Sequence, residues 1–220
     1  SSTSSLPPKN QIDNNVLPIS TLAQCYLDDF CVLQNTKKIS VSYLNTYQGK
    51  NPESTNGCTV IAPLLAIHHF HHEHCQDVIP DSVIEEVIDT QAPSILPEVR
   101  RNLGLSPDAL IIPSDVHDYL MNENLFTQEQ FVGCCGGDIL SHDHLNELLH
   151  LLSCNEASKK KIAATFYFHE HVVCILKTIR WDGEVWYEVI DSLPCERGAY
   201  KNSNLKVGGL RPSTWRSDRL

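Results

Sequence analysis

Helix-forming and strand-forming segments are separated along this chain of 220 residues, and their separation limits the fold more than any other feature. Residues 82–90, 114–125 and 141–152 carry apolar side chains at helical spacing, and each segment starts with a serine that can cap a helix. Residues 162–168, 172–179 and 185–190 are instead β-branched and aromatic, as is typical of strands. Helices followed by strands predict an α+β fold with an antiparallel sheet in the last third.

The N-terminal residues differ in character from the rest of the chain. Residues 1–20 are polar, contain three prolines and show no periodicity, so we expect a flexible or loosely ordered arm. Residues 38–43 alternate and contain β-branched side chains, which predicts a short strand. A chain of this length accommodates one domain of ordinary size, and we expect residues 21–220 to form it.

The charge balance and the cysteines restrict the partners and the compartment. Lys and Arg number 17 against 27 Asp and Glu, a net charge of −10, which argues against binding to nucleic acid or to an anionic membrane. The longest apolar run, residues 60–67, is too short to span a bilayer. The nine cysteines are odd in number and scattered, so they predict an intracellular, cytoplasmic or nuclear protein.

One cysteine stands where a nucleophile can be activated. Residues 59–75 begin with an apolar stretch and form a run too long for a strand, which predicts a buried helix with Pro63 in its first turn. Cys58 directly precedes this run, and the free N–H groups of a helix start favour a thiolate. Far downstream, His171 and Asp191 lie on neighbouring predicted strands. The three residues suggest a nucleophile, a base and the carboxylate that orients the base.

The turn between the last two predicted strands decides whether this triad can form. A three-residue loop over residues 181–183, with its glycine in the left-handed conformation, pairs Val173 with Asp191. His171 is then a diagonal neighbour of Asp191 on the same face, whereas His169 lies two residues further away. A two-residue turn would shift the register by one and separate His171 from Asp191. We therefore predict the three-residue loop and assign the role of base to His171.

The order Cys58, His171, Asp191 resembles that of the papain-like cysteine protease superfamily. The resemblance covers residues 48–194 and rests on NGC opening a helix, HVV opening a strand and VIDSLP closing the next strand. VIDSLP is also similar to the corresponding strand of SUMO-type proteases, whose nucleophile comes after the histidine and aspartate. NGC with LLAI is similar to MINDY-type deubiquitinases, although four residues, 59–62, intervene here before the Pro-Leu-Leu-Ala-Ile run. The resemblance implies a helical lobe, led by the nucleophile helix, packed on a C-terminal antiparallel sheet.

Papain-like enzymes also place a glutamine upstream of the cysteine, where its side-chain amide helps to hold the oxyanion. Gln48 matches this role, but it lies ten positions before Cys58, which exceeds the usual spacing, and an insertion within residues 50–55 would account for the difference. Asn51 and Asn56 are alternatives, because the chemistry requires an amide N–H directed at the developing charge, together with the backbone N–H of Cys58.

These features predict a thiol-dependent hydrolase that cleaves a peptide or isopeptide bond, with ubiquitin or a ubiquitin-like protein as the expected substrate. The acidic chain suits the basic tail that precedes the Gly-Gly end of such modifiers. A transglutaminase-like acyl transferase with the same triad is one alternative. A non-catalytic protein-binding module on a protease-like scaffold, with Cys58 as a small buried apolar residue, is another.

A cluster of histidines suggests a metal site as a further alternative. Pairs within it lie four residues apart on one helix face, but no second ligand-bearing segment has a matching spacing. We interpret the cluster as the polar end of a helix and expect neither a metal nor another cofactor. Its members are His68, His69, His71, His72, His74 and Cys75.

Overall fold

The computed structural model describes residues 19–72, 79–127, 141–153, 161–168, 170–180, 182–195 and 203–208. The chain divides into two compact units, Ser1–Lys37 and Lys38–Leu220. Helix α1, Ile19–Asn35, belongs to the first unit. The division therefore falls after Lys37 rather than after residue 20, because residues 19–35 form a helix whose backbone hydrogen bonds close locally. The expected arm lies outside the described residues up to residue 18.

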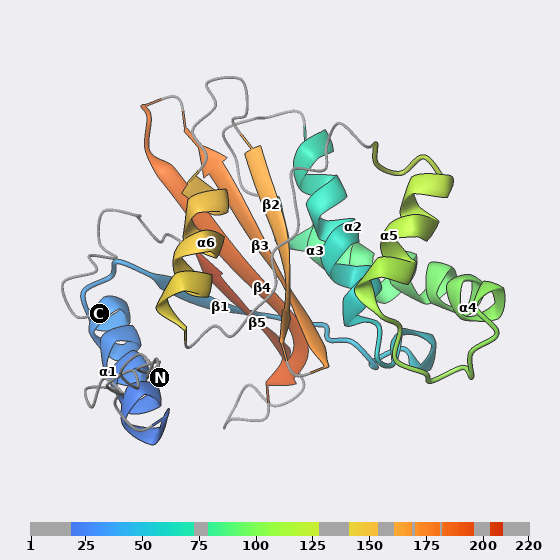
Figure 1. Cartoon of the computed structure of the whole chain (residues 1–220), viewed down its shortest axis with the longest axis horizontal. Coiled ribbons are helices and arrows are strands. Elements are labelled where there is room, and N and C mark those ends of the chain that lie inside the picture. The colour runs from blue at the N-terminus through green and yellow to red at the C-terminus, as the bar shows by residue number, and fades with distance from the viewer. Residues whose placement is uncertain are drawn as a thin grey trace, which may run out of the picture. The chain divides into compact units, whose positions relative to one another are not determined.

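The second unit contains an antiparallel sheet of five strands in the order β1-β5-β4-β3-β2 (Figure 1). Together with the helices, this sheet confirms the α+β class. The three predicted C-terminal strands are present, and the expected N-terminal strand pairs with a fifth strand that was not predicted from the sequence. The strands are β1 (Ser40–Leu44), β2 (Lys161–Phe168), β3 (His171–Ile179), β4 (Val185–Cys195) and β5 (Ser203–Gly208).

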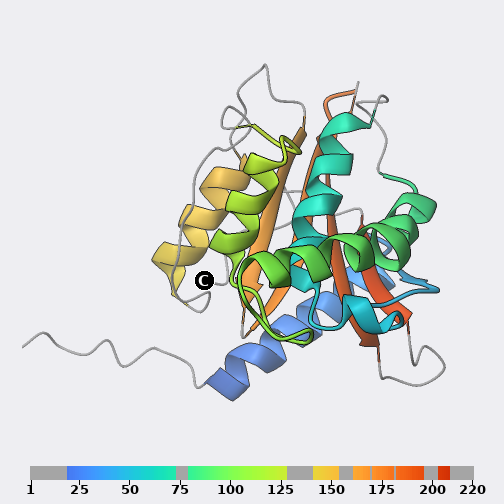
Figure 2. The same ribbon diagram turned by 90° about the vertical axis from the view of Figure 1, so that its right-hand side faces the viewer.

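Helical segments lie between β1 and β2 in the sequence, and Figure 2 shows them from the side. The α3 and α4 helices are joined without a break by η2, a π-helical turn. Neither Ser82 nor Ser114 caps its helix as expected, because α3 begins after Pro80 and α5 begins at Pro113, so both serines lie within the first turn. The segments are η1 (Pro52–Ser54), α2 (Cys58–His71), α3 (Asp81–Glu86), η2 (Val87–Gln91), α4 (Ala92–Asn102), α5 (Pro113–Asn122) and α6 (His142–Ser153).

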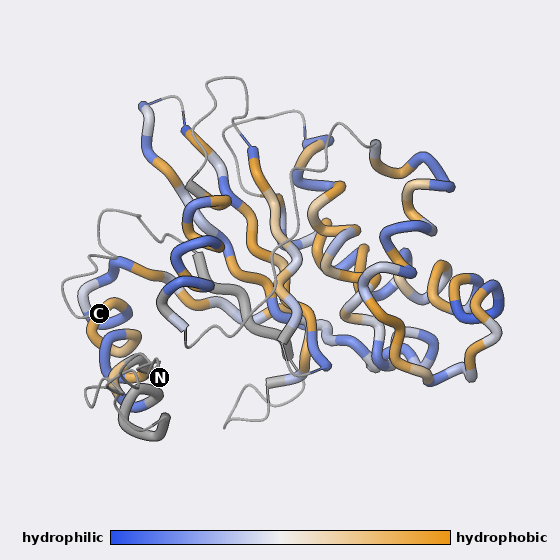
Figure 3. Tube along the Cα trace, in the orientation of Figure 1, coloured by the Kyte–Doolittle hydropathy of each residue, from blue (hydrophilic) through white to orange (hydrophobic). Residues whose placement is uncertain are grey.

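The α2 helix is the centre of the core. Most of its residues are apolar (Figure 3), so it is stable only when surrounded by other elements. Its buried side chains form one cluster with Val172, Cys174 and Leu176, which alternate along one face of β3. Because α2 begins at Cys58, Pro63 is its sixth residue rather than part of its first turn, and the expectation for Pro63 was wrong.

The opposite face of the sheet carries α6. Lys177 of β3 and Tyr187 of β4 are paired in the ladder, and both donate hydrogen bonds to the carbonyl oxygen of Leu152, at 2.7 and 3.4 Å. Lys177 is one residue out of phase with Leu176, so its side chain leaves the sheet on the face away from α2. Among the described residues, no helix combines the length and the apolar character that crossing a membrane requires.

Candidate active site

The β3–β4 hairpin has the predicted register. Cys174 pairs with Ile190 and Ile179 with Val185, so the same ladder continued by one residue sets Val173 opposite Asp191. Arg180 and Glu184 close the loop through a 2.8 Å backbone hydrogen bond, and Gly183 has a φ of 81°. The three-residue loop is thereby confirmed, and the two-residue alternative is excluded. Trp181 itself, like His169, lies outside the described residues.

This register brings His171 and Asp191 together. The ring Nε2 of His171 donates a hydrogen bond to Oδ1 of Asp191 at 2.7 Å. The same oxygen accepts the backbone N–H of Leu193 at 2.9 Å, which fixes the carboxylate. Pairing between β4 and β5 is irregular after Asp191, as expected where a strand redirects a side chain at its end. The Asp191 carboxylate therefore orients the His171 ring and also accepts a backbone hydrogen bond from the local turn.

Cys58 is the first residue of α2, directly after the N-cap residue Gly57. The chain reaches it through Asn56, whose φ of 55° is left-handed. A Cβ on Gly57 would lie 2.8 Å from the carbonyl oxygen of Ser54, so only glycine fits this approach. Cys58 is 1% exposed, which is less accessible than a nucleophile facing a cleft would be. A reagent therefore needs a local displacement to reach the sulfur.

His171 links the two ends of the triad. Burial opposes charge on its ring, but hydrogen bonds to Asp191 and to Cys58 outweigh burial and raise the pKa of His171 to about 9. Because Asp191 occupies Nε2, Nδ1 is the nitrogen left to face the sulfur. The ring is therefore an imidazolium at neutral pH, and it can donate a proton to each of its two partners.

Gln48 lies beside the same end of β4. Its backbone N–H donates to the carbonyl oxygen of Ser192 at 2.8 Å, and its side-chain oxygen accepts the Ser192 hydroxyl at 2.9 Å. The hydroxyl thus occupies the amide oxygen and orients the side chain, while the amide N–H₂ keeps its donor capacity. This is the group that an oxyanion requires.

The two alternative amides have other partners. The Asn51 side-chain oxygen caps η1 by accepting the backbone N–H of Glu53 at 3.1 Å. The Asn56 amide N–H₂ donates to the carbonyl oxygen of Asp108 at 2.8 Å. Of the three candidates, Gln48 is the one whose side chain is held at β4 beside Asp191.

The nine residues between Gln48 and Cys58 fold back on Ser54. The Ser54 hydroxyl accepts the backbone N–H of Gly49 at 3.0 Å, and its carbonyl oxygen accepts the N–H of Gly57 at 3.1 Å. Ser54 is fully buried. The residue after Gln48 and the residue before Cys58 are therefore held by one serine, and the added length is taken up by η1.

The other candidate ligands and thiols have separate roles. His68 contacts the side chain of Gln91 at 2.8 Å, and the buried His69 contacts the carbonyl oxygen of Lys177 at 2.9 Å. Burial lowers the pKa of His69 to about 4. Within the described part of the chain, no group of three or more His, Cys, Asp or Glu residues could hold a metal ion, whereas His74 and Cys75 lie outside it. Cys174 is buried on the opposite face of β3 from His171.

Two residues of this region were not identified from the sequence. Ser192 orients Gln48 across 144 positions, and Asp89 contacts the loop that carries Gln48. Ser192 lies in the VIDSLP motif directly after Asp191, whereas no motif connects Asp89 to the triad. No family model matches this chain, and no curated protein is significantly similar to it in sequence.

Proposed function

We propose that this protein is a thiol-dependent hydrolase that cleaves a peptide or isopeptide bond through Cys58, His171 and Asp191. One observation carries the proposal: the ring of His171 is hydrogen-bonded both to Asp191, at 2.7 Å, and to Cys58 at the start of a helix. A buried apolar cysteine needs no such partner. A thiolate that must attack a carbonyl carbon does.

The first half-reaction follows from the protonation state of this pair. The reactive form of the pair is the Cys58 thiolate beside the His171 imidazolium. The Sγ thiolate of Cys58 attacks the carbonyl carbon, and the oxyanion receives hydrogen bonds from the Cys58 N–H and the Gln48 amide. The C–N bond breaks as His171 protonates the leaving amine, which leaves a thioester on Cys58.

The second half-reaction regenerates the enzyme. Neutral His171 takes a proton from water, and the resulting hydroxide attacks the thioester carbon. The C–S bond breaks, the carboxylic acid leaves, and the sulfur returns as a thiolate beside the imidazolium. Asp191 holds the ring in one orientation through both steps.

The substrate class is a ubiquitin-like modifier within this proposal. The resemblance to papain-like isopeptidases supports it, and so does the net charge of −10, because an acidic protein attracts the basic tail that precedes the modifier's C-terminal Gly-Gly.

A panel of ubiquitin and ubiquitin-like proteins, each with a C-terminal electrophile, tests the nucleophile and the substrate class together. We expect at least one member to label the protein covalently and peptide mapping to locate the adduct on Cys58. Cys58→Ala should abolish labelling while leaving the thermal midpoint near that of the wild type, because one sulfur is removed without a large cavity.

Two histidine variants provide a matched pair, with His169→Ala as the control for His171→Ala. His171→Ala should abolish turnover of the modifier that labels, whereas His169→Ala should retain most of it. An adduct on another cysteine, or turnover that survives Cys58→Ala, would contradict the proposed nucleophile. If small acyl donors label Cys58 but no ubiquitin-like protein does, the proposed role of Cys58 as nucleophile stands and the proposed substrate class is rejected. Transfer to an added amine faster than to water would indicate an acyl transferase.

A further inference from the structure

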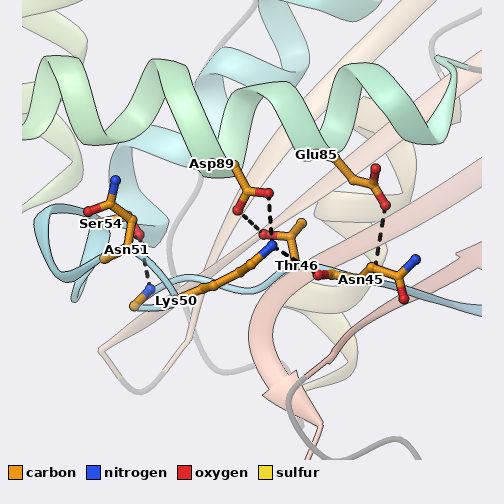
Figure 4. A network of polar contacts seen from close by, with 8 residues as sticks. Asn45, Thr46, Lys50, Asn51, Ser54, Glu85 and Asp89 are labelled. Carbon is orange, nitrogen blue, oxygen red and sulfur yellow. Dashed lines mark hydrogen bonds and ion pairs between the residues drawn. The ribbon is translucent and has the colours of Figure 1, made fainter.

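The loop that carries Gln48 is bonded to a helix outside the triad (Figure 4). Asp89 lies in η2, and its two carboxylate oxygens have different partners. Oδ1 accepts the hydroxyl of Thr46, and Oδ2 pairs with Nζ of Lys50 at 3.1 Å. One carboxylate thus contacts the loop two residues before Gln48 and two residues after it.

The segment between these contacts is a tight turn. The backbone N–H of Lys50 donates to the carbonyl oxygen of Tyr47 at 3.1 Å, and Gly49 has a φ of 85°. This pattern is that of a type II turn, with Gln48 at its first central position. Lys50 Nζ also donates to the carbonyl oxygen of Asn45 at 3.2 Å, so the ends of the loop are joined. Gln48 therefore lies at the tip of a turn whose two ends are held together by hydrogen bonds.

The Asp89 side chain is 36% exposed, and its contact with Thr46 is the one that differs from an ordinary surface ion pair. Thr46 is fully buried, so its hydroxyl needs the partner that Asp89 supplies. Asp89 sits in the π turn, where the N–H of Ala92 bonds to the carbonyl oxygen of Val87, five residues back. Pro93 follows and lacks the N–H that would bond to the carbonyl of residue 89 in a regular helix. The local chain thus departs from α-helical geometry at the point that meets the loop.

We infer that Asp89 is a positioning residue that holds Gln48 in the orientation the oxyanion requires, by bonding Thr46 on one side of the turn and Lys50 on the other. The inference rests on the proposed role of Gln48. Asp89 does not touch the reacting atoms in this assignment. It acts by limiting the displacement of an amide donor, and a displacement of about 1 Å can reduce a rate by about 10²-fold.

Two reagents separate this role from a general effect on Cys58. Attack of the thiolate on p-nitrophenyl acetate forms the C–S bond of an acetyl thioester and breaks the C–O bond to p-nitrophenolate through an oxyanion. Alkylation by iodoacetamide displaces iodide without an oxyanion. Both reagents must reach the same buried sulfur, so the ratio of the two rates cancels access and thiolate content. Replacing the exposed Cys25 and Cys31 with serine, and subtracting the rate of Cys58→Ala, confines the signal to Cys58.

In this background, Gln48→Ala should lower the ratio of acylation to alkylation by about 10²-fold, as the loss of one oxyanion donor does. Asp89→Asn should lower it by about 10-fold with the alkylation rate unchanged, and Lys50→Met should act in the same direction. The double variant Gln48→Ala, Asp89→Asn should be no slower than Gln48→Ala alone, because no donor remains to be positioned. Glu86→Gln, an exposed carboxylate on the same helical segment, is the matched control and should leave the ratio unchanged.

A normal ratio in Asp89→Asn and Lys50→Met, with a reduced ratio in Gln48→Ala, would overturn the role of Asp89 and leave the proposed function intact. Multiplicative losses in the double variant would also overturn it, since they indicate independent effects. A normal ratio in Gln48→Ala would reject Gln48 as the oxyanion donor and Asp89 with it. Absence of acylation at Cys58 would reject the proposed function itself.

Discussion

Replacement of Asp191 by asparagine tests the electrostatics of the triad. The pKa of His171 is raised from 6.5 to about 9 against the effect of burial. This difference corresponds to roughly 3 kcal/mol in favour of the imidazolium. Asp191 supplies the largest favourable contribution, and the hydrogen bond to Cys58 supplies the next. The side chains of His171 and Asp191 are 16% and 32% exposed, so water screens the pair only in part.

Asp191→Asn keeps an oxygen for the Leu193 N–H but removes the negative charge. We expect the titration midpoint of His171 to fall by at least about one pH unit, equivalent to about 1.4 kcal/mol or more. Two-dimensional NMR of the histidine rings, from pH 5 to pH 10.5, measures the midpoint directly, and His171→Gln identifies the resonance. The measurement needs no substrate, so it is independent of the proposed reaction.

Glu170→Gln is the matched control. It removes a negative charge from an exposed side chain next to His171 and should leave the midpoint near 9. If the wild-type ring titrates near 6.5, the hydrogen bonds do not overcome burial. If the midpoint stays near 9 in Asp191→Asn, the carboxylate is not its cause. Either result would refute the electrostatic argument.

Two further predictions concern stability. Because the folded-state pKa of His171 lies above the unfolded value, its contribution is complete below pH 6.5 and disappears as the pH rises to about 9. The wild type should therefore exceed His171→Gln in unfolding free energy by up to about 3 kcal/mol at pH 6 and lose this advantage above pH 9, as measured by urea denaturation. Gly57→Ala should lower the unfolding free energy by about 1–3 kcal/mol, because the new Cβ would lie 2.6 Å from Leu96 and 2.8 Å from the rigid Ser54 carbonyl. Unchanged urea midpoints in Gly57→Ala would show that the turn before Cys58 relaxes freely.

Local patterns in the sequence were sufficient for the class of fold and for one register. Alternation and β-branching located the strands of the C-terminal sheet, because side-chain periodicity depends on neighbours within a few residues. The loop over residues 181–183 was also predictable, since a glycine in the left-handed conformation sets the length of a hairpin turn. That one turn was enough to predict His171 and Asp191 on the same face, which the 2.7 Å hydrogen bond between them confirms.

Features that depend on contacts between distant segments were not predictable. The pairing of β5 with β1 and β4 is one case. The segment 203–208 is short, and no turn signal in the sequence connects it to the strand that begins at residue 40. The wrong helix starts have a local cause instead, because Pro80 and Pro113 come just before the serines and the helices begin at or directly after these prolines.

The oxyanion donor at the candidate site was also not predictable from the sequence alone. The sequence alone determined that an amide precedes Cys58, and it left three candidates. Only the tertiary structure separated them, because Ser192 holds Gln48, whereas η1 and Asp108 occupy Asn51 and Asn56. Short-range steric and capping preferences are encoded in neighbouring residues, but the partners of a side chain are set by packing between elements that are far apart in the chain. The burial of Cys58 and the contact of Asp89 with the Gln48 loop were decided at that level.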